Sequence, residues 1–89
     1  MTTLFVRHTV RDYATWRKLY DGFAPVQKAK GVTAQAVYRS AEDPNEVTVT
    51  HEFASLDAAK DFVGSPELHA AMQGAGVTGA PELWFADKV

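Results

Sequence analysis

The order in which two hydrophobic periodicities alternate along the chain constrains its fold more than any other feature. Apolar residues recur at every second position, the spacing of a β-strand, in four segments: residues 4–9, 32–39, 46–53 and 83–86. Aromatic residues after the first segment recur every three or four positions, the spacing of one helix face: Tyr13, Trp16, Tyr20 and Phe23. A second helical pattern at residues 56–63 follows the third strand, and a short helix opens at Ser65-Pro66-Glu67. The order β-α-β-β-α-β predicts one α+β domain, residues 1–89, with the ferredoxin-like arrangement.

Residues that favour helix ends stand at the boundaries of the helical patterns. Asp12 and Ser55 can each accept a hydrogen bond from the first turn of the helix that follows. Pro25 lacks a backbone N–H and disfavours a helix interior, so we expect a kink or a restart near residues 22–25. Gly31 is a favourable stop for the first helical region.

The predicted sheet has one face without helices. The crossover through the first helix leads us to expect that strands 4–9 and 46–53 are parallel neighbours, with the helices on one face of the sheet. The opposite face would carry three apolar side chains among threonines and charged residues: Phe5, Val37 and Trp84. A chain of 89 residues without cysteine has a thin core and no disulfide to reinforce it. We therefore expect a homodimer that packs sheet against sheet, with a monomer whose face contacts water as the alternative.

Charge and hydropathy argue against two classes of partner. Nine Lys and Arg residues stand against eleven Asp and Glu residues, which gives a formal net charge of −2. Nucleic-acid binding needs a basic surface, whereas the basic residues here are dispersed, so we expect no nucleic-acid partner. No apolar stretch approaches the roughly 20 residues that span a bilayer, and the N-terminal residues lack a signal-peptide pattern. We expect a cytoplasmic protein that does not bind membranes.

The histidines of the first and third strands are the most informative polar residues. His8 and His51 both fall on the side of their strands that faces the helices. If the strands are parallel and Val6 pairs with Val49, His8 lies opposite His51, with Cβ atoms about 5 Å apart. Imidazoles act as acids or bases near neutral pH, so we predict both histidines as catalytic residues.

The second strand would leave unfilled volume beside these histidines. Pairing Tyr38 with Val47 puts the small Ala34 and Ala36 on the helix-facing side. An apolar cavity with a few polar groups is the usual form of a small-molecule site, so we predict a hydrophobic ligand here. The predicted substrate-binding residues come from this strand and from the helices: Trp16, Tyr20, Ala34, Ala36, Tyr38, His69 and Met72.

Other readings of the same residues remain open. The histidines and the aromatic stripe also fit an ordinary core, and His69 also fits an exposed helix surface. Three histidines can bind zinc, but no two share the short spacing of a metal motif, so we expect no metal site. The segment Gly74-Ala75-Gly76-Val77-Thr78-Gly79 matches G-x-G-x-x-G literally. Because it follows a helix and precedes a strand, the reverse of the dinucleotide motif, we expect a flexible connection there.

Four segments carry a resemblance to a known family: Phe5-Val6-Arg7-His8, Asp12-Tyr13-Ala14-Thr15-Trp16, residues 47–59 and Ser65-Pro66-Glu67-Leu68. With these segments the chain resembles the dimeric α+β barrel superfamily, especially the antibiotic biosynthesis monooxygenase-like domains. The resemblance implies a homodimer whose two sheets form a barrel, with a cavity between sheet and helices in each subunit. It also implies catalysis without a cofactor, because the carbanion of a deprotonated aromatic or polyketide-like substrate reacts with O₂ directly.

The chain departs from the specific patterns of that family. Monooxygenase and haem-degrading members use an asparagine in the cavity, whereas Asn45, the only asparagine here, lies in a predicted turn. The haem-degrading type also has a tryptophan on the second helix, where this chain has Phe62, so we do not expect haem degradation. Three hypotheses remain. The first is a proton-abstracting enzyme, a monooxygenase or cyclase-like protein in which Tyr20 or Tyr38 orients the substrate. The others are a non-catalytic dimer that binds a ligand in the same cavity and a structural subunit without a cavity.

Overall fold

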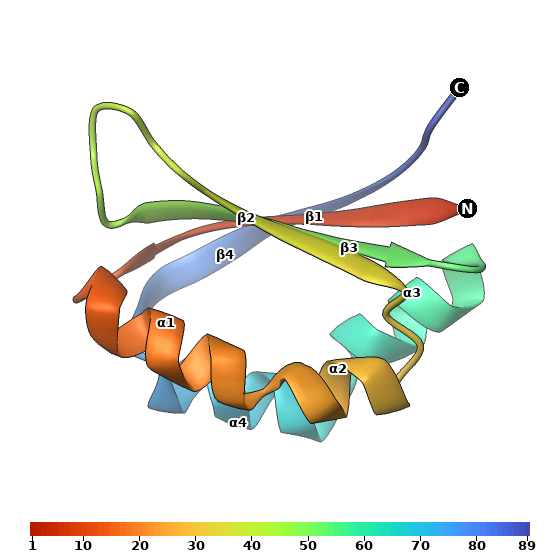
Figure 1. Ribbon diagram of the computed structural model, residues 1–89, viewed down its shortest axis with the longest axis horizontal. Helices are drawn as coiled ribbons and strands as arrows, with labels where there is room; N and C mark the ends of the chain where they lie inside the picture. The colour runs from red at the N-terminus through yellow and green to blue at the C-terminus, as the bar shows by residue number, and fades with distance from the viewer.

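Four strands form one antiparallel sheet, and the helices all lie on one face of it (Figure 1). The computed structural model describes residues 1–89, and the strand order across the sheet is β2-β3-β1-β4. The elements in chain order are β1 (Thr2–Val10), α1 (Tyr13–Gly22), α2 (Ala24–Ala29), β2 (Ala34–Arg39), β3 (Glu46–Phe53), α3 (Leu56–Val63), α4 (Pro66–Gly74) and β4 (Val77–Asp87). The predicted α+β class, element order and single helix-covered face are therefore confirmed. None of the helices has the length and apolar character that crossing a membrane requires.

The predicted helix boundaries are confirmed because each depends on a local hydrogen bond or a backbone restriction. The Asp12 carboxylate accepts from the Thr15 amide at 3.0 Å, and the Ser55 hydroxyl accepts from the Ala58 amide at 3.2 Å. The first helical region is interrupted at Phe23, between α1 and α2, where Pro25 follows within the first turn of α2. After this break α2 leads to β2, which lies at one edge of the sheet (Figure 1).

The predicted parallel pairing of the first and third strands is wrong: β1 and β3 are antiparallel neighbours. The crossover through α1 and α2 connects β1 to β2, and β3 is antiparallel to both of them, so β1 and β2 point the same way. β3 follows β2 through a short turn and inserts between β2 and β1. The crossover rule therefore holds, but it applies to β1 and β2 rather than to β1 and β3.

The predicted register of β2 is wrong by one residue, which exchanges its two faces. Tyr38 pairs with Thr48 rather than with Val47, so Ala34, Ala36 and Tyr38 lie on the sheet face without helices. Gln35, Val37 and Arg39 face the helices instead. Val37 packs against the core there and pairs with Val49, and the Arg39 guanidinium lies 3.9 Å from the centre of the Tyr13 ring. Val37 is therefore excluded from the predicted apolar face.

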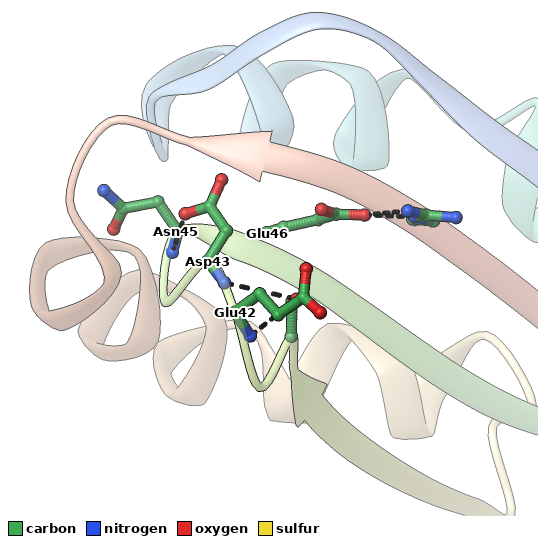
Figure 2. Close-up of polar contacts among 6 residues, drawn as sticks. Glu42, Asp43, Asn45 and Glu46 are labelled. Carbon is green, nitrogen blue, oxygen red and sulfur yellow. Dashed lines mark hydrogen bonds and ion pairs between the residues drawn. The ribbon is translucent and has the colours of Figure 1, made fainter.

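The turn between β2 and β3 is held by hydrogen bonds from its own polar side chains (Figure 2). The Ser40 hydroxyl accepts from the amides of Glu42 and Asp43, at 3.2 and 3.3 Å, and the Asp43 carboxylate accepts from the Asn45 amide at 2.9 Å. Figure 2 shows Asn45 in this turn, next to the start of β3, and Glu46 paired with an arginine of β1, which is Arg7. The sequence predicts Asn45 in a turn.

The last strand is longer than the predicted residues 83–86, since β4 extends from Val77 to Asp87. The glycine-rich segment is only partly a connection: Gly74 ends α4, while Gly79 lies inside β4. Gly79 has φ +71°, and the pairing of β4 with β1 shifts register between Arg7 and Thr9. A glycine at such a bulge permits the backbone angle that a side chain disfavours.

The core lies between the sheet and the helices. Its buried apolar residues come from β1, β3, α1, α3 and the residue that follows α4: Leu4, Val6, Val10, Trp16, Val47, Val49, Phe53, Ala59, Phe62 and Ala75. On the opposite face Phe5 and Trp84 stack in parallel with ring centres 5.3 Å apart, and 42% of Trp84 remains exposed. Tyr38, 59% exposed, lies on the same face. This face therefore carries exposed aromatic surface from its two outer strands.

Candidate functional site

An apolar cavity lies between the helix-facing side of the sheet and the helices. Eleven of its fourteen lining residues are hydrophobic, and the other three are His8, Gln27 and His51. β1 contributes His8 and β3 contributes His51 from below, while α1 and α2 contribute Trp16, Tyr20 and Gln27 from above. The cavity therefore has few polar groups, and two of the three are imidazoles.

The cavity is small in the structure. Its volume is about 50 Å³, room for roughly three or four water molecules, whereas an apolar cavity of about 150 Å³ accommodates benzene. An aromatic ligand therefore has to displace one wall. α4 is the wall with the weakest attachment, since none of its residues is buried and it faces the cavity through Leu68, Ala71 and Met72. An unbranched methionine adapts to a new shape more easily than a branched side chain.

A second, wider hollow of about 330 Å³ lies next to the cavity, on the surface formed by α1, α2 and β2. Tyr20 and Gln27 line both the cavity and this hollow. The outer hollow also includes the charged Asp21 and Lys28 and the polar Gln35. Tyr20 and Gln27 therefore separate the buried cavity from the solvent-exposed hollow.

The two histidines lie at opposite ends of the cavity floor, so their predicted side-by-side placement is wrong. In the antiparallel register His8 pairs with Val47 and His51 pairs with Leu4, with the Val6–Val49 pair between them. Val47 and His51 are four residues apart on β3, which corresponds to roughly 14 Å along the strand. Both imidazoles still face the helices and line the same cavity, as predicted.

Aromatic rings of α1 span the distance between the histidines. Trp16 lies edge-on to His8 with ring centres 5.7 Å apart, and Tyr20 lies 6.1 Å from His51. Trp16 and Tyr20 stack on each other at 4.8 Å. The roof of the cavity is therefore a continuous aromatic surface from one imidazole to the other.

Burial makes both histidines neutral at physiological pH. It lowers the pKa of His51 to about 4, and it lowers the pKa of His8 as well, because a buried imidazolium loses its hydration. Both ring nitrogens of His8 and Nδ1 of His51 are buried without a hydrogen-bond partner. A neutral imidazole has one donor and one acceptor nitrogen, so the protein leaves hydrogen-bonding capacity of both rings unused.

Tyr20 connects His51 to the second strand. Its hydroxyl donates to Gln35 Oε1 at 2.7 Å and lies 3.2 Å from His51 Nε2. Burial raises the pKa of Tyr20 to about 12, while contact with the Gln27 amide acts more weakly in the opposite direction. Tyr20 is therefore a neutral hydrogen-bonding group and not a base.

The structure brings together part of the predicted site. His8, His51, Trp16, Tyr20 and Met72 line one cavity. His69 is exposed on α4 and does not line the cavity, and the predicted placement of Ala34, Ala36 and Tyr38 in the cavity is wrong because they lie on the other sheet face.

Two glutamines at this site are absent from the residues predicted from the sequence. Gln27 is 3% exposed and lines the cavity, and its position four residues after Phe23 continues the helical stripe, a signal that was available. Gln35 faces the helices because the register of β2 differs by one residue from the predicted one. No group of three or more His, Cys, Asp or Glu side chains comes together as a metal site would require.

Comparison with known proteins identifies the family and agrees with the fold. The family model for antibiotic biosynthesis monooxygenases matches residues 10–74, more than half of the chain. The chain belongs to the antibiotic biosynthesis monooxygenase family. No protein of curated function matches the sequence.

Solved structures of this family share the whole fold. A Bordetella bronchiseptica protein classed with these monooxygenases superposes with a TM-score of 0.85 at 20% identity, covering 99% of this chain and 96% of that one. One from Caulobacter crescentus has 26% identity and a TM-score of 0.78, with 99% and 89% of the two chains covered. SnoaB from Streptomyces nogalater, a cofactor-independent oxygenase, has 17% identity and a TM-score of 0.75, with 99% and 94% covered.

Proposed function

We propose that the protein is a cofactor-independent oxygenase that removes a proton from a hydrophobic aromatic substrate, with His51 as the base. The observation that carries this proposal is the buried, neutral imidazole of His51 in an apolar cavity, with Nδ1 unpaired. Burial keeps the His51 imidazole neutral at working pH, and its Nδ1 has no partner in the protein, which supports this nitrogen as the proton acceptor. The similarity to SnoaB, a cofactor-independent oxygenase, supports the same class of reaction.

The reaction balances without any further reagent than dissolved O₂. His51 takes a proton from an activated CH₂ group flanked by aromatic rings, and the resulting carbanion transfers one electron to O₂. The two radicals combine into a C–O bond, and the peroxide takes up the proton held by the imidazolium. Loss of water, with the second CH₂ hydrogen leaving as a proton, converts the carbon to a carbonyl. The sum is CH₂ plus O₂ giving C=O plus H₂O.

In this proposal His8 and the aromatic rings of Trp16 and Tyr20 bind the substrate. His8 lies at the far end of the cavity, so it is placed to hydrogen-bond the part of an elongated substrate remote from the reacting carbon. Trp16 and Tyr20 offer stacking surface along the length between the two histidines. A flat, electron-rich aromatic molecule fits this combination of a stacking surface and polar ends.

The protein is proposed to act as a homodimer through the sheet face that carries Phe5 and Trp84. Trp84 is 42% exposed although it stacks on Phe5, and an exposed aromatic pair on a sheet face without helices favours a protein partner. Arg7 and Glu46 pair with each other on this face, so their charges do not oppose the association.

A second candidate is a non-catalytic dimer that binds a small ligand. The cavity volume of about 50 Å³ favours it, because an aromatic substrate of several rings does not fit without movement of α4. The two candidates differ in whether a bound aromatic molecule is turned over.

The test is oxygen consumption with anthrone and with a substituted hydroquinone as substrates. We expect turnover by the native protein and a loss of about 100-fold or more in kcat for His51→Gln, the range that general-base catalysis contributes. Lys60→Gln, an exposed change on α3, is the control and should keep full activity. Full activity of His51→Gln would exclude His51 as the base. Binding of anthrone without turnover by the native protein would favour the ligand-binding dimer.

A further inference from the structure

The register of β2 places Gln35 directly beside His51. The two residues pair across β2 and β3 on the helix-facing side of the sheet. The Tyr20 hydroxyl from α1 contacts both, at 2.7 Å from Gln35 Oε1 and 3.2 Å from His51 Nε2. One hydroxyl therefore joins an amide oxygen and a ring nitrogen that belong to neighbouring strands.

We infer that Gln35 is a positioning residue, which acts through Tyr20 to hold the His51 proton on Nε2 and so leave Nδ1 as the free acceptor. This inference rests on the proposed function, since it identifies the atom of His51 that receives the substrate proton. It also narrows the substrate class to molecules that present a hydrogen-bond donor or an acidic C–H to that atom.

A count of protons gives the reason. A tyrosine hydroxyl has one hydrogen, and an amide oxygen is an acceptor only, so the Tyr20 hydrogen is used by the short contact with Gln35. The remaining contact, between the Tyr20 oxygen and His51 Nε2, is a hydrogen bond only if Nε2 carries a hydrogen. A bare Nε2 would instead place two acceptor lone pairs against each other. A neutral imidazole has a single N–H, so Nδ1 is then unprotonated.

The surroundings of Nδ1 agree with this assignment. The atom is buried and has no partner in the protein, and the ring to which it belongs lines the cavity. An unpaired acceptor in an apolar cavity favours a ligand that donates, such as a phenol or hydroquinone O–H, over an ether or a quinone that only accepts. Fixing the tautomer of a catalytic imidazole through a second residue has a large effect in other enzymes, since the wrong tautomer cannot accept the proton.

Gln35 can be changed with little disturbance because its side chain is exposed at the outer hollow, whereas Tyr20 and His51 are part of the cavity. In Gln35→Leu the Tyr20 hydroxyl loses its acceptor and turns its hydrogen toward His51 Nε2. The ring then has to carry its own hydrogen on Nδ1, the atom needed as the base. Gln35→Glu keeps an acceptor oxygen at the same place and serves as the matched conservative variant.

The test is ¹⁵N NMR of the His51 ring at pH 7.5 in the full-length native protein and in both variants. We expect the Nε2–H tautomer in the native protein and in Gln35→Glu, and a switch to Nδ1–H in Gln35→Leu. Native protein with Nδ1–H, or Gln35→Leu with an unchanged tautomer, overturns the inference whatever the activity.

Two further measurements separate this inference from the proposed function. Phenol should bind the native protein at least about tenfold more tightly than anisole, which lacks the donor, and Gln35→Leu should lose that preference. In the anthrone assay Gln35→Leu should lower kcat at least about tenfold, whereas Gln35→Glu should have a kcat close to that of the native protein. If the tautomers and the phenol preference are as expected but native protein turns over neither substrate, the inference holds and the oxygenase proposal fails.

Discussion

Mild acid is expected to destabilise the protein through His51, and the magnitude follows from the burial of its ring. The side chain is 4% exposed, and its pKa in the folded protein is about 4, against 6.5 for an unperturbed histidine. Between these two values the unfolded chain binds a proton that the folded protein does not bind. The free energy of unfolding therefore decreases as the pH falls from 6.5 toward 4, by up to about 1.4 kcal/mol per pH unit, and is unaffected by His51 above pH 7. At pH 5 the loss from His51 alone is roughly 2 kcal/mol.

Urea denaturation at pH 7.5 and at pH 5.0 measures this effect when the native protein is compared with His51→Gln. Glutamine does not titrate, so the variant keeps the contributions of every other acidic and basic group, and the difference between the two proteins isolates His51. We expect the native protein to lose roughly 2 kcal/mol more than the variant between the two pH values. His69→Gln removes an exposed imidazole and should give a curve parallel to that of the native protein.

The reasoning is refuted if the native protein and His51→Gln lose the same free energy between pH 7.5 and pH 5.0. That result would mean that the His51 ring is hydrated in the folded protein and takes up a proton there as easily as in the unfolded chain. It would also remove the argument that His51 is a neutral base in a dry cavity.

Three further predictions address the cavity, the proposed dimer and a helix cap. Met72→Ala removes part of the cavity wall that α4 provides, so saturating benzene should raise the Tm of this variant by more than it raises that of the native protein, as measured by calorimetry. Trp84→Lys places a charge on the exposed sheet face, and light scattering at micromolar concentration should then give the mass of one chain instead of two. Ser55→Ala removes the acceptor at the N-terminus of α3 and should lower the free energy of unfolding by about 1 kcal/mol in urea, while Ser55→Asp retains it.

The parts of the fold that local sequence determines could be predicted well. Asp12 and Ser55 accept hydrogen bonds from amides three residues later, so their role depends only on nearby backbone. Pro25 restricts its own backbone and interrupts the helix wherever the rest of the chain lies. The family resemblance rests on four short segments of the sequence, and the family match over residues 10–74 confirms it.

The register of β2 could not be predicted from its pattern. Successive side chains of a strand point to opposite faces, and both alternating sets of β2 contain apolar residues. One set consists of Ala34, Ala36 and Tyr38. In the other set Val37 stands between the polar Gln35 and Arg39. In the structure the set with a single apolar residue faces the helices. Val37 pairs there with Val49, and the polar Gln35 and Arg39 on either side of it contact tyrosines of α1. Those tyrosine contacts are tertiary, so no strand periodicity contains them.

The direction of β1 relative to β3 decided the geometry of the candidate site, and it depends on the position of a third strand. With parallel strands the two histidines would be neighbours and a single small ligand could contact both. With antiparallel strands the Val6–Val49 pair separates them, and each imidazole has different surroundings. His51 contacts Tyr20, whereas His8 has only an edge-on contact with Trp16 and no hydrogen-bond partner. These different surroundings are the reason for proposing His51 as the base and His8 as a binding group.

The unpaired nitrogens of His8 and His51 favour a ligand site over an ordinary core. A buried polar atom without a partner costs about 1–3 kcal/mol, and three ring nitrogens are in this state in a domain of 89 residues without disulfides. Small domains are stable by only about 5–15 kcal/mol, so leucine or phenylalanine at these positions would make a more stable core. A ligand that pairs with one of these nitrogens removes its cost, and 1–3 kcal/mol corresponds to roughly 5- to 150-fold in affinity. Under the proposed function, the same atoms that weaken the free protein provide its selectivity for a donor ligand.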